Sequence, residues 1–180
     1  MNAKIIGIIF FILLGAGAAL GFGIFSGRAP APEVREFQSV PQVLLRDYQA
    51  REVRLSDFSG KPMLVNAWAS WCPYCRDELD DFAAIKKEFA RQGKDVVILA
   101  VNRAEAPEAA QRYSDALGVS EEIVFLADPD DSFYKAIGGF SMPETVFIDA
   151  EGKIRDHRRG AMAYEEIRRR IENAFFTSDK

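Results

Sequence analysis

The junction between an apolar run and a helical segment, which carries the only two cysteines, constrains the fold of this chain most. Residues 63–68 form a short apolar run that suits a buried strand. Residues 73–90 then show helical spacing, with apolar side chains on one side and acids and lysines on the other. We therefore expect Cys72 and Cys75 where a buried strand gives way to a helix, with Pro73 in the first helical turn.

This placement predicts thiol chemistry. Unpaired N–H groups and a partial positive charge at a helix start stabilise a thiolate, so the pKa of Cys72 is expected to be lowered. The thiolate is the attacking species in disulfide exchange, and two intervening residues let the sulfurs meet when oxidised. The alternative is half of a zinc site, which needs two more ligands. The chain offers only His157, which we interpret as a solvated residue at a strand end.

The remaining hydrophobic pattern predicts an α/β fold with a central mixed β-sheet flanked by helices. The first parallel strand pair needs a right-handed crossover through the helix at residues 73–90. The other expected strands cover residues 43–45, 51–55, 96–101, 123–126, 145–148 and 153–155, and the other helices cover 107–117, 132–137 and 165–175.

The N-terminal segment is apolar, with no charged side chain from residue 5 to 27. Its 21-residue core spans about 31 Å as a helix, which matches the hydrocarbon core of a bilayer. We predict a transmembrane helix within 1–27, a proline-containing linker at 28–41 and the folded domain at 42–180. A cleaved signal peptide, with a small-residue site at Ala16-Gly17-Ala18, is the alternative.

The charge balance favours no nucleic-acid function. The chain carries 23 basic and 27 acidic residues, a net charge of −4. A nucleic-acid-binding domain needs a basic stripe, which this mildly acidic and mixed sequence lacks.

Several motifs in order resemble the thioredoxin-like superfamily. Trp68-Ala69-Ser70-Trp71-Cys72-Pro73-Tyr74-Cys75-Arg76 carries the resemblance, with Gly139-Phe140-Ser141-Met142-Pro143-Glu144-Thr145 downstream. More narrowly, the sequence is similar to the membrane-anchored, extracytoplasmic branch that includes the TlpA, ResA and CcmG (DsbE) proteins. One departure is the Pro-Tyr dipeptide between the cysteines, which is typical of glutaredoxins and leaves the redox potential open.

The resemblance implies a role for each residue of the dithiol site. Cys72 would attack a substrate disulfide, and Cys75 would resolve the mixed disulfide after losing its proton. Asn66 stands where ordinary thioredoxins have a buried aspartate, and an amide cannot act as a base. Glu78, one turn after Cys75 on the same helical face, is the candidate proton acceptor.

The resemblance also implies a substrate-binding loop. Pro143 would be cis, and Met142 would offer its backbone to an extended substrate. Glu144 is expected to add negative charge beside the site, and Trp71 to contact the substrate. Negative charge from Glu78 and Glu144 would oppose thiolate formation and favour a reductant.

The expected function is therefore a thiol-disulfide oxidoreductase that reduces disulfides of extracytoplasmic proteins, with no cofactor beyond the Cys72–Cys75 disulfide. Its expected partners are an apocytochrome c-like or copper-site protein and a membrane dithiol donor of the DsbD or CcdA kind. The expected location is the outer side of a bacterial inner membrane. The alternatives are a thiol oxidase, or a tethered binding or metallochaperone module that uses Cys72, Cys75 and His157.

Overall fold

The computed structural model describes residues 39–177. The predicted transmembrane helix and nearly all of the predicted linker lie outside these residues. Within them, no helix combines the length and apolar character that a membrane crossing requires. The described domain is an α/β fold with one mixed sheet, as the sequence predicts.

The sheet has seven strands in the order β2-β1-β5-β4-β3-β6-β7. The strands are β1 (Leu44–Arg46), β2 (Glu52–Arg54), β3 (Met63–Trp68), β4 (Val97–Arg103), β5 (Val124–Asp128), β6 (Glu144–Ile148) and β7 (Ile154–Arg159). β3, β4 and β5 are parallel, whereas the other pairs are antiparallel. This arrangement brings the end of β3, the end of β4 and the start of β6 to one edge of the sheet.

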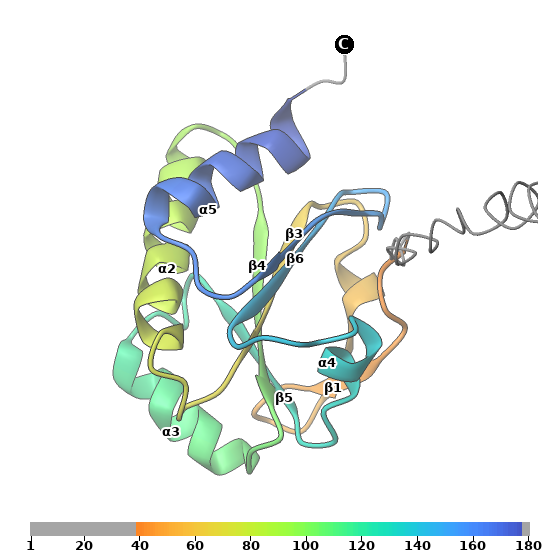
Figure 1. The fold of residues 1–180 in the computed structure, drawn as a ribbon, viewed down its shortest axis with the longest axis vertical. Helices are drawn as coiled ribbons and strands as arrows, with labels where there is room; N and C mark the ends of the chain where they lie inside the picture. The colour runs from red at the N-terminus through yellow and green to blue at the C-terminus, as the bar shows by residue number, and fades with distance from the viewer. Residues whose placement is uncertain (1–38, 178–180) are drawn as a thin grey trace, which may run out of the picture. The chain divides into compact units, whose positions relative to one another are not determined.

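Helices cover both faces of the sheet (Figure 1). The α-helices are α2 (Cys75–Arg91), α3 (Pro107–Leu117), α4 (Ser132–Ala136) and α5 (Tyr164–Ile171), with a 3₁₀ turn η1 (Leu55–Phe58) and a π-helical turn η2 (Glu172–Phe176). In Figure 1, α2, α3 and α5 lie on one side of the sheet and α4 lies on the other.

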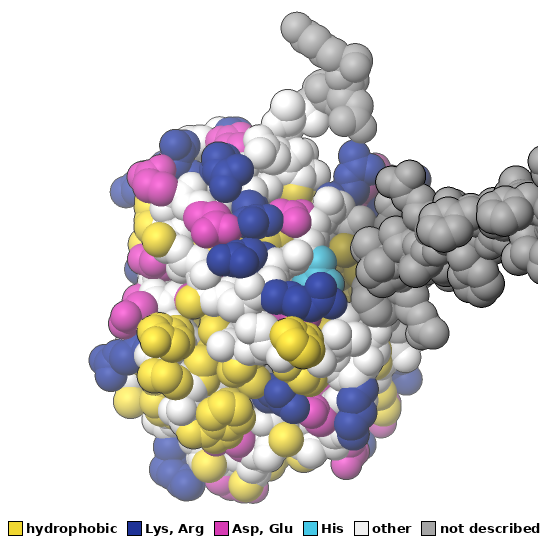
Figure 2. Space-filling view, in the orientation of Figure 1, with side chains coloured by type: hydrophobic (Ala, Val, Ile, Leu, Met, Phe, Trp, Pro, Cys, Tyr) yellow, Lys and Arg dark blue, Asp and Glu magenta, His cyan; other side chains and the backbone are white. Residues whose placement is uncertain are grey.

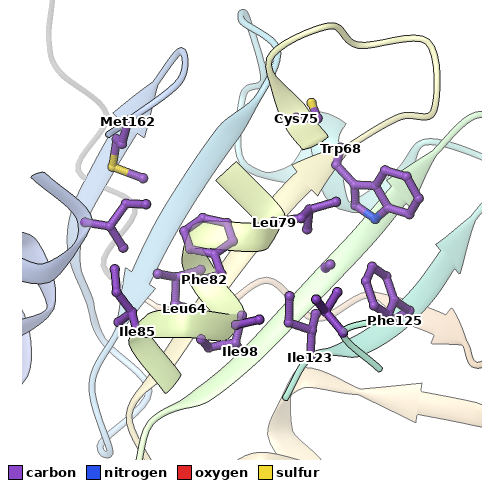
Figure 3. Packing of buried hydrophobic residues seen from close by; sticks show 14 of the residues in the cluster. Leu64, Trp68, Cys75, Leu79, Phe82, Ile85, Ile98, Ile123, Phe125 and Met162 are labelled. Atoms are coloured by element: carbon purple, nitrogen blue, oxygen red, sulfur yellow. The ribbon is translucent and has the colours of Figure 1, made fainter. Parts of the chain in front are cut away.

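Strand β3 divides the core because its side chains alternate between the two faces. Leu64 and Trp68 pack in the cluster under α2 and α5, whereas Met63, Val65 and Ala67 pack in the cluster on the opposite face. Figure 3 shows the first cluster, in which the apolar side of α2 lies over the sheet. The helical spacing seen in the sequence is therefore the pattern of this buried face.

Most element boundaries differ by one or a few residues from the sequence-based prediction, and two of these differences lie close to the cysteines or to the edge of the sheet. α2 begins at Cys75, so Pro73 lies in the turn before the helix and not in its first turn. The N–H of Cys75 donates to the carbonyl oxygen of Cys72 across that turn, at 3.3 Å. β7 extends to Arg159, because its charged residues pair with β6 along the whole strand. Alternating charges conceal this strand in the sequence.

Candidate functional site

The two cysteines form a disulfide at the N-terminal end of α2. Their sulfurs are 2.09 Å apart and their Cα atoms 5.4 Å apart. Cys75 is the first residue of the helix, and Cys72 belongs to the loop that leaves β3. Both residues are enclosed, with exposed fractions of 2% and 0%. A partner sulfur therefore reaches Cys72 only by fitting closely against the surrounding side chains.

Three exposed aromatic side chains lie next to the cysteines or in the loop before Pro143. Trp71 is 63% exposed and Tyr74 is 66% exposed, and Phe140 in the loop before Pro143 is 86% exposed. Figure 2 shows hydrophobic side chains gathered on this face over the loop that precedes α2, while charges of both signs alternate over α5. Trp71 is thus placed at the surface beside Cys72, where it is able to contact a partner.

Glu78 is a buried carboxyl group one helical turn from Cys75. Its side chain is 2% exposed. Its Oε2 accepts a hydrogen bond from Asn66 Nδ2 at 3.0 Å, and its Oε1 accepts one from the Met162 backbone N–H at 2.9 Å. Burial raises the pKa of Glu78 to about 8, although both hydrogen bonds and the charge of Arg158 act in the opposite direction.

Asn66 holds Glu78 from the sheet. The Asn66 amide nitrogen also donates to Thr145 Oγ1 at 2.9 Å, so one side chain on β3 links α2 with β6. Asn66 and Thr145 are directly opposite each other in the β3–β6 pair, which explains this contact. The amide is therefore a fixed donor toward the Glu78 carboxyl group.

The loop before β6 carries a cis peptide bond between Met142 and Pro143, as the resemblance implies. Pro143 is buried, while Met142 is half-buried and packs against the core cluster that includes both cysteines. Met142 and Pro143, both predicted from the sequence, thus lie at the same end of the sheet as the disulfide.

Glu144 occupies a different environment from the one expected. Its side chain has no exposed surface. Its Oε2 accepts hydrogen bonds from the backbone N–H groups of Phe140 and Ser141, and its Oε1 lies 2.6 Å from His157 Nε2 and 3.2 Å from Arg159 Nε. Burial alone would raise the pKa of Glu144, but the His157 contact and the two backbone N–H bonds hold it below its ordinary value.

These contacts correct one sequence-based interpretation. His157 is not a solvated residue at a strand end, because it lies within β7 and its side chain is only 14% exposed. Glu144 is buried and pairs with Arg159, and its expected contribution of negative charge beside the disulfide stays a prediction.

Sequence reasoning missed Glu105, which anchors the disulfide loop. Its carboxylate accepts hydrogen bonds from the backbone N–H and the hydroxyl of Ser70, at 2.7 and 2.5 Å, and from Asn102 Nδ2 at 2.7 Å. These hydrogen bonds lower the pKa of Glu105 against the opposing effect of burial. The available signal was its position just after β4, since parallel strands β3 and β4 end at the same sheet edge.

The described residues contain no group of three or more histidine, cysteine or acidic side chains arranged to hold a metal ion. The site itself consists of the disulfide, the buried carboxyl group of Glu78 and the adjoining loop. Together they can exchange a dithiol for a disulfide and transfer the accompanying proton.

Comparison with known proteins agrees with this chemistry. Residues 29–174 match the Redoxin family. The chain is 32% identical over 163 residues to thiol-disulfide oxidoreductase ResA of Geobacillus thermodenitrificans, covering 90% of this chain and 91% of the relative. It is 36% identical over 137 residues to thiol:disulfide interchange protein DsbE of Allochromatium vinosum, covering 73% of this chain and 65% of that protein.

A solved structure shares the fold. The structure of dsbF from MTB, in mixed oxidised and reduced forms, superposes with a TM-score of 0.67 at 25% identity and covers 76% of this chain and 99% of its own. The similarity thus extends from the disulfide loop to nearly the whole described domain. The chain belongs to the Redoxin family and is a thiol-disulfide oxidoreductase of the ResA/DsbE type, with the Cys72–Cys75 disulfide at its active site.

Proposed function

We propose that the reduced protein transfers two electrons to disulfides of extracytoplasmic proteins, such as apocytochrome c, with Glu78 accepting the proton of Cys75. The Cys72 thiolate attacks a substrate disulfide, forms a mixed disulfide and releases one substrate thiolate. The Cys75 thiolate then attacks the Cys72 sulfur, forms the internal disulfide and releases the second substrate thiol. The substrate gains two electrons and the Cys72–Cys75 pair loses two.

The buried carboxyl group of Glu78 is the observation that carries this proposal. Its pKa of about 8 is close to the ordinary thiol pKa of about 8.5. General acid–base catalysis is most efficient when the pKa of the catalytic group lies near the operating pH, and a value of about 8 meets this condition. Glu78 and Cys75 are both buried and one turn apart on α2, which supports transfer between them without bulk solvent.

The N-terminus of α2 supports the reactivity of Cys72. Among the described residues, no side chain caps this helix end. The Cys75 N–H donates to the Cys72 carbonyl, and the N–H groups that follow it in the first turn are the ones that favour a nearby thiolate. Three acids in the first two turns, the exposed Asp77 and Asp80 and the half-buried Asp81, act against the same thiolate, and Arg76 opposes them only in part. We infer a thiolate of moderate stability and thus a reductant, on the basis of these acids and not of Glu144.

The loop ending at Pro143 is the proposed substrate contact. Met142 precedes the cis bond, and within residues 39–177 its backbone N–H and carbonyl make no hydrogen bond. An extended substrate segment is able to pair with these two groups, as in strand addition. Trp71 and Phe140 supply exposed apolar surface for the flanking residues of that segment.

The proposed location follows from the sequence outside the described residues. The uncharged segment up to residue 27 is long enough to anchor the domain in a membrane. Lys4 before it favours a cytoplasmic N-terminus and an external domain. In that compartment a membrane dithiol donor of the DsbD or CcdA kind would regenerate the dithiol.

The direct test uses the full chain, purified in detergent and chemically reduced. It should reduce the disulfide of a CxxCH peptide, and its redox potential against glutathione should fall below about −200 mV. A Cys72→Ser variant should be inactive. Full activity of that variant would exclude the proposed chemistry, and a potential above about −150 mV would instead support a thiol oxidase.

A further inference from the structure

The loop before Pro143 is held by hydrogen bonds to groups outside it. Glu144 Oε2 accepts from the N–H of Phe140 at 2.8 Å and from the N–H of Ser141 at 2.9 Å. The Tyr134 hydroxyl donates to the Ser141 carbonyl at 2.8 Å. The loop is therefore fixed from two directions, by the strand that follows it and by α4.

The loop also packs closely against the same tyrosine. A Cβ atom at Gly139 would lie 2.5 Å from ring carbons of Tyr134, so only glycine permits this approach. The Tyr134 ring is itself covered by the Arg103 guanidinium, whose carbon is 3.6 Å from the ring centroid. Arg103 in turn pairs with Asp131, which fixes its position.

The second carboxylate oxygen of Glu144 faces the edge strand β7. Arg159 lies directly opposite Glu144 in the β6–β7 pair, and His157 lies two residues before it on the same face. A buried carboxylate without cationic partners would carry a large desolvation penalty. Arg159 Nε supplies that cation at 3.2 Å, and His157 Nε2 adds a polar contact at 2.6 Å, so a charged acceptor is able to lie directly behind the loop.

These contacts occupy the backbone polar groups on either side of Met142. The Pro143 carbonyl accepts from the Gly160 N–H at 2.9 Å, so the N–H groups of Phe140 and Ser141 and the carbonyls of Ser141 and Pro143 are all occupied. Within the described chain, the N–H and carbonyl of Met142 make no hydrogen bond.

We propose that Glu144 is a positioning residue for substrate selection, and not a substrate contact. Its carboxylate, paired with Arg159 and in contact with His157, holds the Phe140 and Ser141 amides so that the Met142 backbone and the Phe140 ring are presented to a polypeptide disulfide. This inference rests on the proposed function, because it assigns polypeptide binding to the loop. Small disulfides need no such loop and should not depend on Glu144.

Two variants of the full chain separate the effect of the Glu144 charge from the effect of its side-chain length. Glu144→Gln keeps an acceptor oxygen but loses the charge and turns an amide group toward Arg159. Glu144→Asp keeps the charge but withdraws the carboxylate by one methylene from the two loop amides. Glu122→Gln is the matched control, because Glu122 is an enclosed acid that pairs with Lys87 and makes no contact with the loop.

Amide hydrogen exchange measured by NMR gives the first readout. In both Glu144 variants the Phe140 and Ser141 amides should exchange at least ten times faster than in the wild type, with no change in the β3 amides. Equal acceleration in the loop and in β3 would mean general destabilisation and would overturn the proposal. Unchanged exchange in the loop would also overturn it.

The reaction with two disulfides gives the second readout. The second-order rate constant for a CxxCH peptide disulfide, divided by that for hydroxyethyl disulfide, should fall at least tenfold in both variants and stay unchanged in Glu122→Gln. An unchanged ratio contradicts a positioning role. If the wild-type chain does not reduce the peptide, the proposed function fails, and the exchange data alone then decide whether Glu144 holds the loop.

Discussion

Glu78 is a buried carboxyl group that forms no ion pair with a cation among residues 39–177. Its two hydrogen-bond donors, Asn66 Nδ2 and the Met162 N–H, are neutral. Neutral donors offset only part of the desolvation penalty of a charged carboxylate. The residue is therefore largely protonated at neutral pH and ionises where thiols do, which suits a group that exchanges protons with Cys75.

This environment predicts how stability depends on pH. The pKa of Glu78 is about 8 in the folded state and 4.5 in the reference state, so the native state binds the extra proton between these values. The stabilising contribution is present below pH 4.5 and is lost as the pH rises to about 8, by at most roughly 1.4 kcal/mol per pH unit. Urea unfolding of the oxidised wild type should show this loss, and Glu78→Gln should not.

The control for this experiment is Glu108→Gln, an exposed acid in the first turn of α3. It should retain the wild-type pH dependence between pH 5 and 8. Parallel pH profiles for the wild type and Glu78→Gln would show that Glu78 does not titrate in this range.

At the residue scale the sequence predicts the dithiol and its proton acceptor, because local spacing places Cys72, Cys75 and Glu78 around the start of one helix. It does not predict the surroundings of Glu144, which depend on the register of β6 against β7. It also misses Glu105, whose contact with Ser70 joins two loops 35 residues apart. Contacts between distant segments leave no periodic signal in either segment.

At the scale of elements, α2 carries two residues of the active site, Cys75 and Glu78, and packs its inner face on the sheet. Phe82 on its inner face has no exposed surface, whereas Phe140 in the loop before Pro143 is 86% exposed. Phe82→Ala should lower the free energy of unfolding by about 3–5 kcal/mol, because it removes a buried ring and leaves a cavity. Urea unfolding measures this change.

The matched variant Phe140→Ala should change the free energy of unfolding by less than about 0.5 kcal/mol. It should nevertheless raise the KM for a peptide disulfide, because Phe140 belongs to the proposed contact surface. Equal stability losses at the two positions would contradict the burial described above, and an unchanged KM would remove Phe140 from the substrate surface.

The loop between β3 and α2 depends on an acid from the neighbouring loop. Glu105 follows Ala104, whose φ of 54° lies in the left-handed region, and it receives three hydrogen bonds from Ser70 and Asn102. Glu105→Gln should lower the free energy of unfolding by about 1–3 kcal/mol, because an amide group then faces N–H donors. Chemical denaturation of the full chain, with Glu108→Gln as the control, measures the difference.

A Glu105→Gln variant as stable as the control would show that these hydrogen bonds make no net contribution to the free energy of unfolding.

The boundaries of elements also show where sequence reasoning is limited. β7 was predicted to end at Arg155 because the residues that follow are charged, yet pairing with β6 extends it to Arg159. Edge strands with polar faces carry a weak hydrophobic pattern, so their length is set by the partner strand.

At the scale of the whole molecule, the two faces of the sheet carry different parts of the site. Asn66 and Thr145 point toward α2 and hold Glu78, whereas Glu144 points to the opposite face and holds the loop. Alternation along β6 therefore places the proton acceptor network and the loop anchor on opposite sides of the sheet, beginning at consecutive residues.

The order of elements and the mixed sheet follow from the sequence, since strands and helices alternate and each carries a clear period. The order in which the strands lie in the sheet does not follow from periodicity, and β1 is paired with β5 in the sheet at a single position, Arg46 opposite Ala127. Global strand order depends on which apolar faces pack together in three dimensions, and a one-dimensional pattern does not contain that information.

The membrane anchor is a prediction for the full chain. In cells, the protein should stay with the membrane fraction after an alkaline carbonate wash, because a span of 21 uncharged residues inserts stably. A variant lacking residues 1–27 should be released into the soluble fraction. Release of the full chain by the wash would support a cleaved signal peptide in place of an anchor.

The central claim is that Glu78 takes the proton of Cys75 during disulfide exchange. The most direct measurement is the release of thionitrobenzoate from a mixed disulfide at Cys72, followed by the absorbance of this coloured thiolate from pH 6 to 10. In the wild type the rate should rise through about pH 8, where Glu78 ionises. Glu78→Gln should react about 100-fold more slowly and lose that inflection, in keeping with the size of general base catalysis. Equal rates and pH profiles in the two proteins would contradict the account.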